Sequence, residues 1–258
     1  MRRIRYHDII NSELQTTIFT RSYLRGVNDN IPVILDTLIQ LGYFTGSKKD
    51  VKTPGGVYHS YCWHQYIQAP YSFRACLVLY ELGHYLEATF ILRYLTEVLA
   101  KMRYLGRHKG LTDKIWNNKK VEIVGRNGKK RRLTLKDIFE EVAPGYYDSN
   151  YGHLLSGFLH GSIAASIFRV KHISPTEGRV RMGSAWDERG ATFVINNFIA
   201  VCYGYLDYFQ KIFPEGFKTL DKELLGQYEK SMSWLEKAMN SHKKEHPRSV
   251  KWYKDIEP

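Results

Sequence analysis

Several charged residues recur inside apolar stretches at spacings that place them on one face of a helix. Arg93 and Glu97 lie four residues apart in the apolar run Phe90–Leu99, and the same stripe continues through Lys101 and Tyr104. Two opposite charges on a buried face must pair or neutralise, because an isolated ion is costly away from water. The spacing leaves two interpretations open: an ion pair that fixes helix packing, or two catalytic residues that line an inner cleft.

A second polar stripe lies in Ser149–Phe168, where His153, Ser156 and His160 are separated by three and four residues. An imidazole titrates near neutral pH, so His160 is a candidate general acid or base, or a phosphate contact. The alternative is a core histidine with satisfied hydrogen bonds. Ser156 and His160 share one helix and no oxyanion-hole motif accompanies them, which argues against a serine hydrolase.

The cysteines and histidines do not form a metal-binding pattern. The three cysteines are widely spaced without a C-x-x-C pair, and the spacing of His59, Cys62 and His64 does not place all three on one helical face. We therefore expect no metal, no cofactor and no disulfide. Thiols in apolar runs, such as Cys76 and Cys202, fit a reducing, cytoplasmic environment.

Positive charge is concentrated in about an eighth of the chain. The 258 residues include 38 Lys and Arg against 26 Asp and Glu, and residues 101–132 contribute +10 of the formal net charge of +12. Cations grouped in this way bind phosphates and release condensed counterions. The alternatives are a solvated loop, or contact with an acidic membrane or protein. The candidates for nucleic-acid binding are Lys119, Lys120, Arg126, Lys129, Lys130, Arg131 and Arg132.

Local signals predict the structure of this basic segment. Asn127-Gly128 separates two short runs within Val121–Leu135, which predicts a β-hairpin with a basic tip. Thr134 and Asp137 have the spacing of a capping box, which predicts a short helix that continues to Val142.

The remaining segments are expected to be helical because apolar residues recur at spacings of three and four. The strongest pattern begins at Pro70, which suits a helix start, and continues to Leu105 with a break expected at Leu82–His84. The other expected helices are Ser12–Leu24, Ile31–Tyr43, Val57–Ile67, Ser149–Val170, Asp187–Phe213 and Thr219–Asn240. We predict an all-α fold, a bundle of six to eight helices with one inserted basic β-hairpin.

The expected organisation is a single helical domain over residues 1–258, with a basic linker and hairpin inserted at 101–135 and a loosely held tail at 241–258. An apolar share of 43% supports a sizeable core, and an aromatic share of 14% argues against disorder. The uncharged stretches Ser149–Phe168 and Gly190–Leu206 are too polar to cross a bilayer comfortably. No apolar run follows the N-terminal MRRIRYHDII, so we expect no secretory signal and no membrane partner.

Two motifs resemble a family of bacterial all-helical proteins with a domain of unknown function. The first is an R-x3-E helix, here Ala88–Glu97. The second is an LS-x3-H element, here Leu155–Ser162 with His160 as its histidine. The resemblance covers about Ser72–Phe213. It implies an all-α fold and no particular activity.

Arg103 and His108 match the R-x4–6-H motif of HEPN domains, helical bundles that often act as metal-independent ribonucleases in toxin and antiviral systems. Arg2 and His7 have the same spacing, but only Arg103 and His108 end a long helix beside the basic segment. Tyr104 stands where such domains commonly have a polar residue. The resemblance implies that His108 moves a proton while Arg103 stabilises phosphate charge. It also implies RNA rather than DNA as the partner, and a homodimer.

Three hypotheses follow. The first is a HEPN-like ribonuclease whose catalytic candidates are Arg103, His108, His160, Glu97 and Arg93. The second is a non-enzymatic nucleic-acid-binding or scaffold protein that uses the hairpin. The third is a small-ligand or partner-binding bundle in which Arg93, Glu97, Tyr104 and His160 line a pocket. The first two require basic residues that lie together and are not neutralised by acidic neighbours.

Overall fold

The computed structural model describes residues 6–23, 30–46, 56–124, 128–148, 151, 170–174, 177–180 and 188–245. These residues form a helical bundle with a short β-hairpin, which confirms the predicted all-α class. The long helices are α1 (Tyr6–Tyr23), α3 (Ile31–Gly46), α4 (Gly56–Glu81), α5 (Tyr85–Arg107), α9 (Glu188–Ile212) and α11 (Lys222–Glu245). The short helices are η2 (Lys109–Leu111), α6 (Thr112–Trp116), α7 (Leu135–Val142) and α10 (Pro214–Lys218). The strands are β1 (Glu122–Val124), β2 (Lys130–Arg132), β3 (Val170–Ser174) and β4 (Glu177–Val180).

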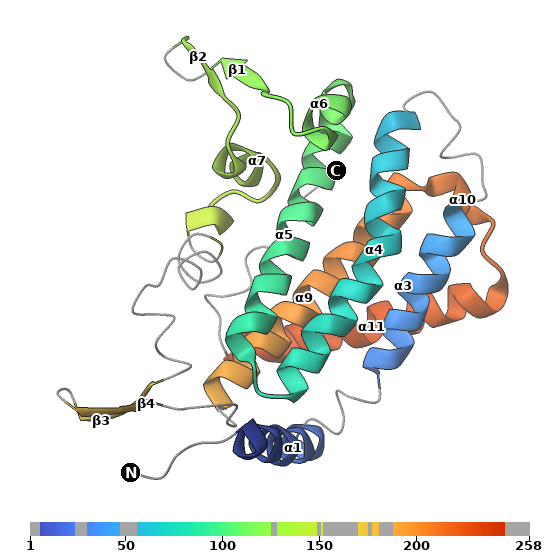
Figure 1. The fold of residues 1–258 in the computed structure, drawn as a ribbon. Helices are drawn as coiled ribbons and strands as arrows, with labels where there is room; N and C mark the ends of the chain where they lie inside the picture. Colours follow the sequence, from blue (N-terminus) through green and yellow to red (C-terminus); the bar gives the residue numbers. More distant parts are fainter. Residues whose placement is uncertain are drawn as a thin grey trace.

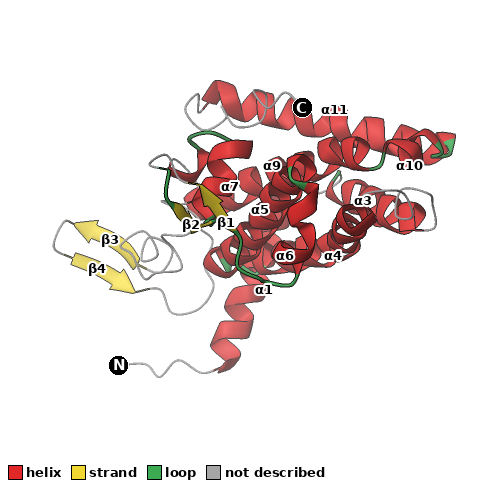
Figure 2. Cartoon of the chain, turned by 90° about the horizontal axis from the view of Figure 1, so that it is seen from above, coloured by secondary structure: helices red, strands yellow, loops and turns green. Residues whose placement is uncertain are grey.

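Helix α5 is the central element of the bundle (Figure 1). It packs against α4, α9 and α7, while α3 lies on α4, and α11 packs on both α3 and α9. Figure 2 shows α3, α4, α5 and α9 gathered together, with α11 along one side. The residues of the buried face of α5 recur at spacings of three and four, and burial of that apolar face holds the helix in place. Its members include Ala88, Leu92, Leu95, Leu99 and Met102.

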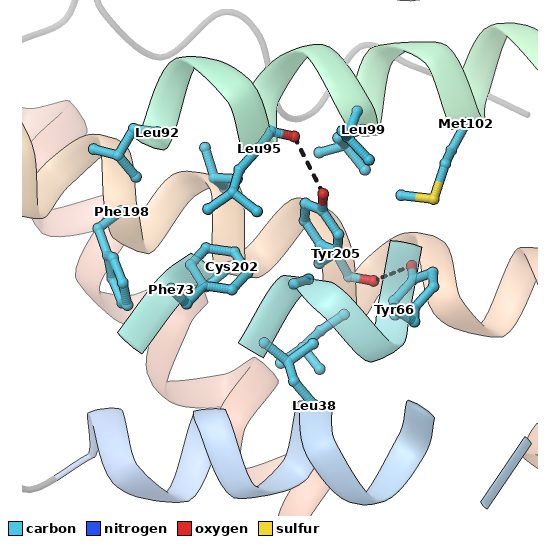
Figure 3. Packing of buried hydrophobic residues seen from close by; sticks show 14 of the residues in the cluster. Leu38, Tyr66, Phe73, Leu92, Leu95, Leu99, Met102, Phe198, Cys202 and Tyr205 are labelled. Carbon is cyan, nitrogen blue, oxygen red and sulfur yellow. Dashed lines mark hydrogen bonds between the residues drawn. The ribbon is translucent and has the colours of Figure 1, made fainter. Parts of the chain in front are cut away.

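Tyrosines reach deep into this core (Figure 3). The hydroxyl of Tyr66 donates to the backbone oxygen of Tyr205 at 2.6 Å, and the hydroxyl of Tyr205 donates to the backbone oxygen of Leu95 at 3.3 Å. Burial raises the pKa of both phenols well above the usual range, so both remain neutral donors. The hydroxyls of Tyr66 and Tyr205 therefore both have an acceptor, which is the condition for placing a polar group in a core at low cost.

The expectation that Pro70 starts a helix is wrong. Helix α4 runs from Gly56 to Glu81 with Pro70 buried inside it. Proline removes one helical hydrogen bond, but its apolar ring is buried here, and burial of the ring offsets part of that cost. The break expected at Leu82–His84 is confirmed. Gly83 has a φ of 81° at this break, a conformation that glycine adopts without steric cost.

The basic hairpin is present where the sequence predicts it. Strands β1 and β2 pair antiparallel, with Glu122 opposite Arg132 and Val124 opposite Lys130. Thr134 is the N-cap of α7, and its capping box with Asp137 is formed on both sides. Figure 1 shows the hairpin at the end of the bundle where α6 and α7 lie.

A second strand pair was not predicted. Strands β3 and β4 pair antiparallel, with Val170 opposite Val180. Because Val170 begins β3, the helix predicted over Ser149–Val170 does not include that residue. Apart from Tyr151, the remainder of that range lies outside the described residues.

The last helix is longer than expected. The sequence predicts its end at Asn240, whereas α11 continues to Glu245, so the first part of the expected C-terminal tail is helical. Residues 246–258 lie outside the described part of the chain. None of the described helices combines the length and the apolar composition that a bilayer span requires.

Candidate nucleic-acid interface

The charges on the polar stripe of α5 pair with each other. The Nε–H of Arg93 is 3.1 Å from Oε1 of Glu97 and 2.8 Å from the hydroxyl of Tyr151, and that hydroxyl donates to the same Glu97 oxygen. The guanidinium lies over the ring of Tyr151, 5.4 Å from its centroid. Nζ of Lys101 lies 3.8 Å from the other carboxylate oxygen, Oε2. The result is a partly buried cluster of two cations, one carboxylate and one phenol.

Tyr151 is the member that the sequence did not reveal. It is 54 residues from Glu97 and no motif connects them. The signal that could have pointed to it is the aromatic density around Phe139, whose ring centroid is 4.6 Å from that of Tyr151. Burial, and then the hydrogen bond to Glu97, raise the pKa of Tyr151 far above its usual range. Tyr151 therefore stays protonated and acts as a donor that orients the carboxylate.

A cavity of about 320 Å³ lies beside this cluster, between α5, α6 and the segments that flank the hairpin. Its polar lining consists of Glu97, Lys101, Asn118, Lys119, Arg132 and Thr134. Its apolar lining consists of Ile115, Val121, Leu133, Leu135 and Ile138. The cavity thus brings one of the catalytic candidates, Glu97, together with two of the nucleic-acid-binding candidates, Lys119 and Arg132.

An ion pair fixes the junction between β2 and α7. The guanidinium of Arg131 makes two hydrogen bonds with the carboxylate of Asp137, at 2.5 and 2.6 Å, and that carboxylate also accepts from the backbone and hydroxyl of Thr134. These donors hold the pKa of Asp137 well below its usual range, Arg131 contributing most. Side chains alternate along a strand, so Lys130 and Arg132 lie on the face opposite Arg131.

Part of the basic segment is neutralised. Four of its cations lie in ion pairs: Lys101 with Glu97, Arg103 with Asp207, Lys119 with Asp113, and Arg131 with Asp137. Among the described residues of 101–132, six exposed cations have no acidic partner within 4.0 Å: Arg107, Lys109, Lys114, Lys120, Lys130 and Arg132. Lys129 is also exposed, whereas Arg126 lies outside the described residues. The positive charge that remains therefore extends from the end of α5 to the hairpin.

Arg103 and His108 have separate partners. The guanidinium of Arg103 lies 3.7 Å from Asp207 and over the ring of Tyr208, both on α9, and its side chain is only 10% exposed. Nε2 of His108 lies 2.7 Å from a carboxylate oxygen of Glu141, on α7. Arg103 lies within α5, whereas His108 is the C-cap of this helix with a non-helical φ of −123°, so the two side chains meet different neighbours.

The five catalytic candidates therefore do not share one cleft. Arg93 and Glu97 contact each other, Arg103 and His108 face different helices, and His160 lies outside the described residues. Tyr104, expected in a ligand pocket, is buried against the imidazole of His108 with ring centroids 4.4 Å apart.

Among the described residues, no histidine or cysteine lines the cavity. No group of three His, Cys, Asp or Glu side chains within the described ranges is placed to hold a metal ion. Burial raises the pKa of all three cysteine thiols, so none is a ready thiolate. The arrangement offers hydrogen bonding and charge for binding. A search of family models, curated proteins and solved structures finds no match to this chain.

Proposed function

We propose that the protein binds single-stranded nucleic acid, RNA in particular, through the hairpin and the adjoining cavity. The observation that carries this proposal is the position of the exposed cations that have no acidic partner in the described part of the chain. Arg132 lines the cavity, Lys130 shares its strand face, and Lys120 lies between two cavity-lining residues. These cations gain most from a polyanion, because no carboxylate of the described residues already pairs with them.

The apolar part of the cavity lining favours single-stranded over double-stranded nucleic acid as the partner. Duplex backbones are contacted from outside, whereas a recessed site with apolar walls accepts bases that are unstacked and exposed. Single-stranded RNA is the expected partner, and DNA of the same sequence is the comparison.

The geometry favours binding over cleavage. A metal-independent ribonuclease requires its proton-transfer group and its phosphate-stabilising cation at the same phosphate. Arg103 is nine-tenths buried beside Asp207, while His108, just beyond the end of α5, pairs with Glu141 on α7. The homodimer implied by the HEPN resemblance stays a prediction.

Fluorescence anisotropy with a labelled RNA oligonucleotide tests the proposal at several salt concentrations between about 50 and 200 mM. The test variant replaces Lys120, Lys130 and Arg132 with alanine. The matched control replaces three exposed lysines of α11, Lys222, Lys230 and Lys237, and removes the same charge.

The hairpin variant should bind more weakly, and its salt slope should fall by about 2, since each lost single-strand phosphate contact removes about 0.7. The control should retain the wild-type slope. Equal losses in both variants would show only a response to net charge and would overturn the proposed interface, as would wild-type protein that does not bind RNA.

A further inference from the structure

The carboxylate of Glu97 is held so that one oxygen remains available. Oε1 accepts from Arg93 and Tyr151, whereas among the described residues the one cation near Oε2 is Lys101, at 3.8 Å, beyond hydrogen-bond distance. Because Glu97 lines the cavity and is fixed by two donors on its other oxygen, it presents an acceptor at a defined position. Lys101 lines the same cavity and supplies a donor beside that acceptor.

The rest of the cavity has two chemically different parts. Ile115, Leu135 and Ile138 provide apolar surface from α6 and α7, while Lys119 and Arg132 provide positive charge. The volume of about 320 Å³ is at the lower end for ligand sites, which suits one small planar ligand and excludes a folded segment. Lys119 already forms an ion pair with Asp113, so Arg132 is the stronger phosphate ligand of the two.

We propose that this cavity receives one unstacked nucleotide of the bound strand. Its base enters between the apolar side chains, donates an N–H to Oε2 of Glu97 and accepts a hydrogen bond from Lys101, while its phosphate contacts Arg132 and Lys119. The inference rests on the proposed function, since the hairpin would hold the neighbouring phosphates. A nucleotide matches all three parts of the lining, because it joins an apolar face, a hydrogen-bonding edge and an anion in one molecule.

Methyl NMR of full-length protein labelled at isoleucine and leucine methyls tests this inference. The probes are the four nucleoside 5′-monophosphates, with ribose 5-phosphate as the probe that lacks a base. We expect the methyl signals of Ile115, Leu135 and Ile138 to shift with at least one nucleotide and to move far less with ribose 5-phosphate. Equal shifts with ribose 5-phosphate would show that only an anion is bound and would overturn the inference.

Two variants separate the cavity from the hairpin. Leu135→Trp fills the cavity and should abolish the nucleotide-induced shifts at Ile115 and Ile138. Glu97→Gln replaces the acceptor and should weaken nucleotide binding about tenfold, as expected for a hydrogen bond to a charged group. Glu141→Gln is the matched control, because it neutralises a carboxylate that does not line the cavity. Thermal melting identifies any variant that fails to fold. The comparison of nucleotides with ribose 5-phosphate uses wild-type protein, so it tests the inference even if a variant does not fold.

The failures of the two proposals are distinguishable. RNA binding by wild-type protein without nucleotide-induced shifts at the cavity methyls would overturn the nucleotide site and leave the hairpin interface standing. Nucleotide-induced shifts without RNA binding would overturn the hairpin interface alone. Wild-type affinity of Leu135→Trp for every nucleotide would place nucleotide binding elsewhere and would end the inference.

Discussion

The hydroxyl of Tyr151 donates to the same oxygen of Glu97 that accepts the Nε–H of Arg93. This contact joins the chain beyond α7 to the middle of α5 across 54 residues. It converts a helical ion pair into a three-residue cluster and leaves the second carboxylate oxygen facing Lys101. The orientation of Glu97 therefore depends on a long-range hydrogen bond from Tyr151 as well as on the ion pair with Arg93.

Tyr151→Phe should lower the free energy of unfolding by about 1–2 kcal/mol, because it removes a hydrogen bond to a charged group in a partly buried setting. Urea denaturation measures the change. Tyr94→Phe is the control, since Tyr94 is 46% exposed on the same helix as Glu97, and its change should stay within about 0.5 kcal/mol. Equal stability of the two variants would contradict a structural role for the Tyr151 hydroxyl.

Gly204→Ala should destabilise the bundle by about 1–3 kcal/mol, because a Cβ there would lie 2.5 Å from Cδ2 of Leu99 and force α9 away from α5. Gly226 on α11 has open space within 4 Å, so Gly226→Ala should stabilise the helix by about 0.5–1 kcal/mol. Opposite signs in chemical denaturation are the expected result. A neutral Gly204→Ala variant would show that the two helices pack less closely than described.

Stability should fall as the pH rises above about 10. Burial raises the pKa of Tyr66 and Tyr205 in the folded state above the ordinary tyrosine value of 10.0. Above that value the unfolded chain releases protons that the folded chain retains, so unfolding becomes more favourable as the pH increases. Below pH 10 the contribution of these two tyrosines to the free energy of unfolding is fully present.

Tyrosinate absorbance measures this effect directly. A subset of the 19 tyrosines should ionise only when the protein unfolds, and urea midpoints should fall between pH 9 and about pH 11. Ionisation of all tyrosines at their ordinary pKa in folded protein would argue against the buried hydroxyls.

Asp137→Asn should weaken RNA binding even though it makes the protein more positive. The substitution removes the partner of Arg131 and part of the cap of α7, so β2 is no longer held beside the cavity. Asp148→Asn is the control, because it removes a nearby exposed carboxylate that pairs with Lys136 instead.

The two variants distinguish position from charge. If only the net charge matters, both variants should bind RNA more tightly than wild type. If the position of the hairpin matters, Asp137→Asn should bind more weakly, and the backbone amides of β1 and β2 should exchange faster with solvent. Tighter binding by Asp137→Asn would contradict the positional account.

RNA should remain intact after incubation with the protein and EDTA, because Arg103 and His108 do not meet at one phosphate. Gel analysis of end-labelled RNA measures cleavage. The informative variant is His108→Ala, with His84→Ala as the control, since His84 also pairs with a glutamate but lies at the other end of α5. Cleavage that His108→Ala abolishes and His84→Ala retains would restore the ribonuclease hypothesis.

Local patterns predicted local structure well. The hairpin around Gly128, the capping box at Thr134 and Asp137, and the helix break at Gly83 each depend on residues close together in the chain. The boundary at Pro70 was wrong because packing of the whole helix outweighed the local preference of one residue. The second strand pair, β3 with β4, escaped the sequence patterns.

In the candidate site, too, local sequence patterns predicted some features, whereas contacts between distant residues decided others. The i, i+4 spacing of Arg93 and Glu97 predicted that both lie on one helical face and left open whether they pair or line a cleft; the structure shows an ion pair. The charge of residues 101–132 predicted a basic surface. Which cations would be neutralised depended on Asp137 and Asp207, and the orientation of Glu97 depended on Tyr151.

Residue types and short spacings alone established the helical class, the hairpin and the sign of its charge, since these follow from backbone geometry and composition within one or two turns of chain. Packing of α5 against α7 and α9 established which side chains meet. The backbone sets the direction of each side chain, and only the neighbours in that direction determine the partner of each charge. That is why Arg103 and His108, a motif in the sequence, face different helices in the folded protein.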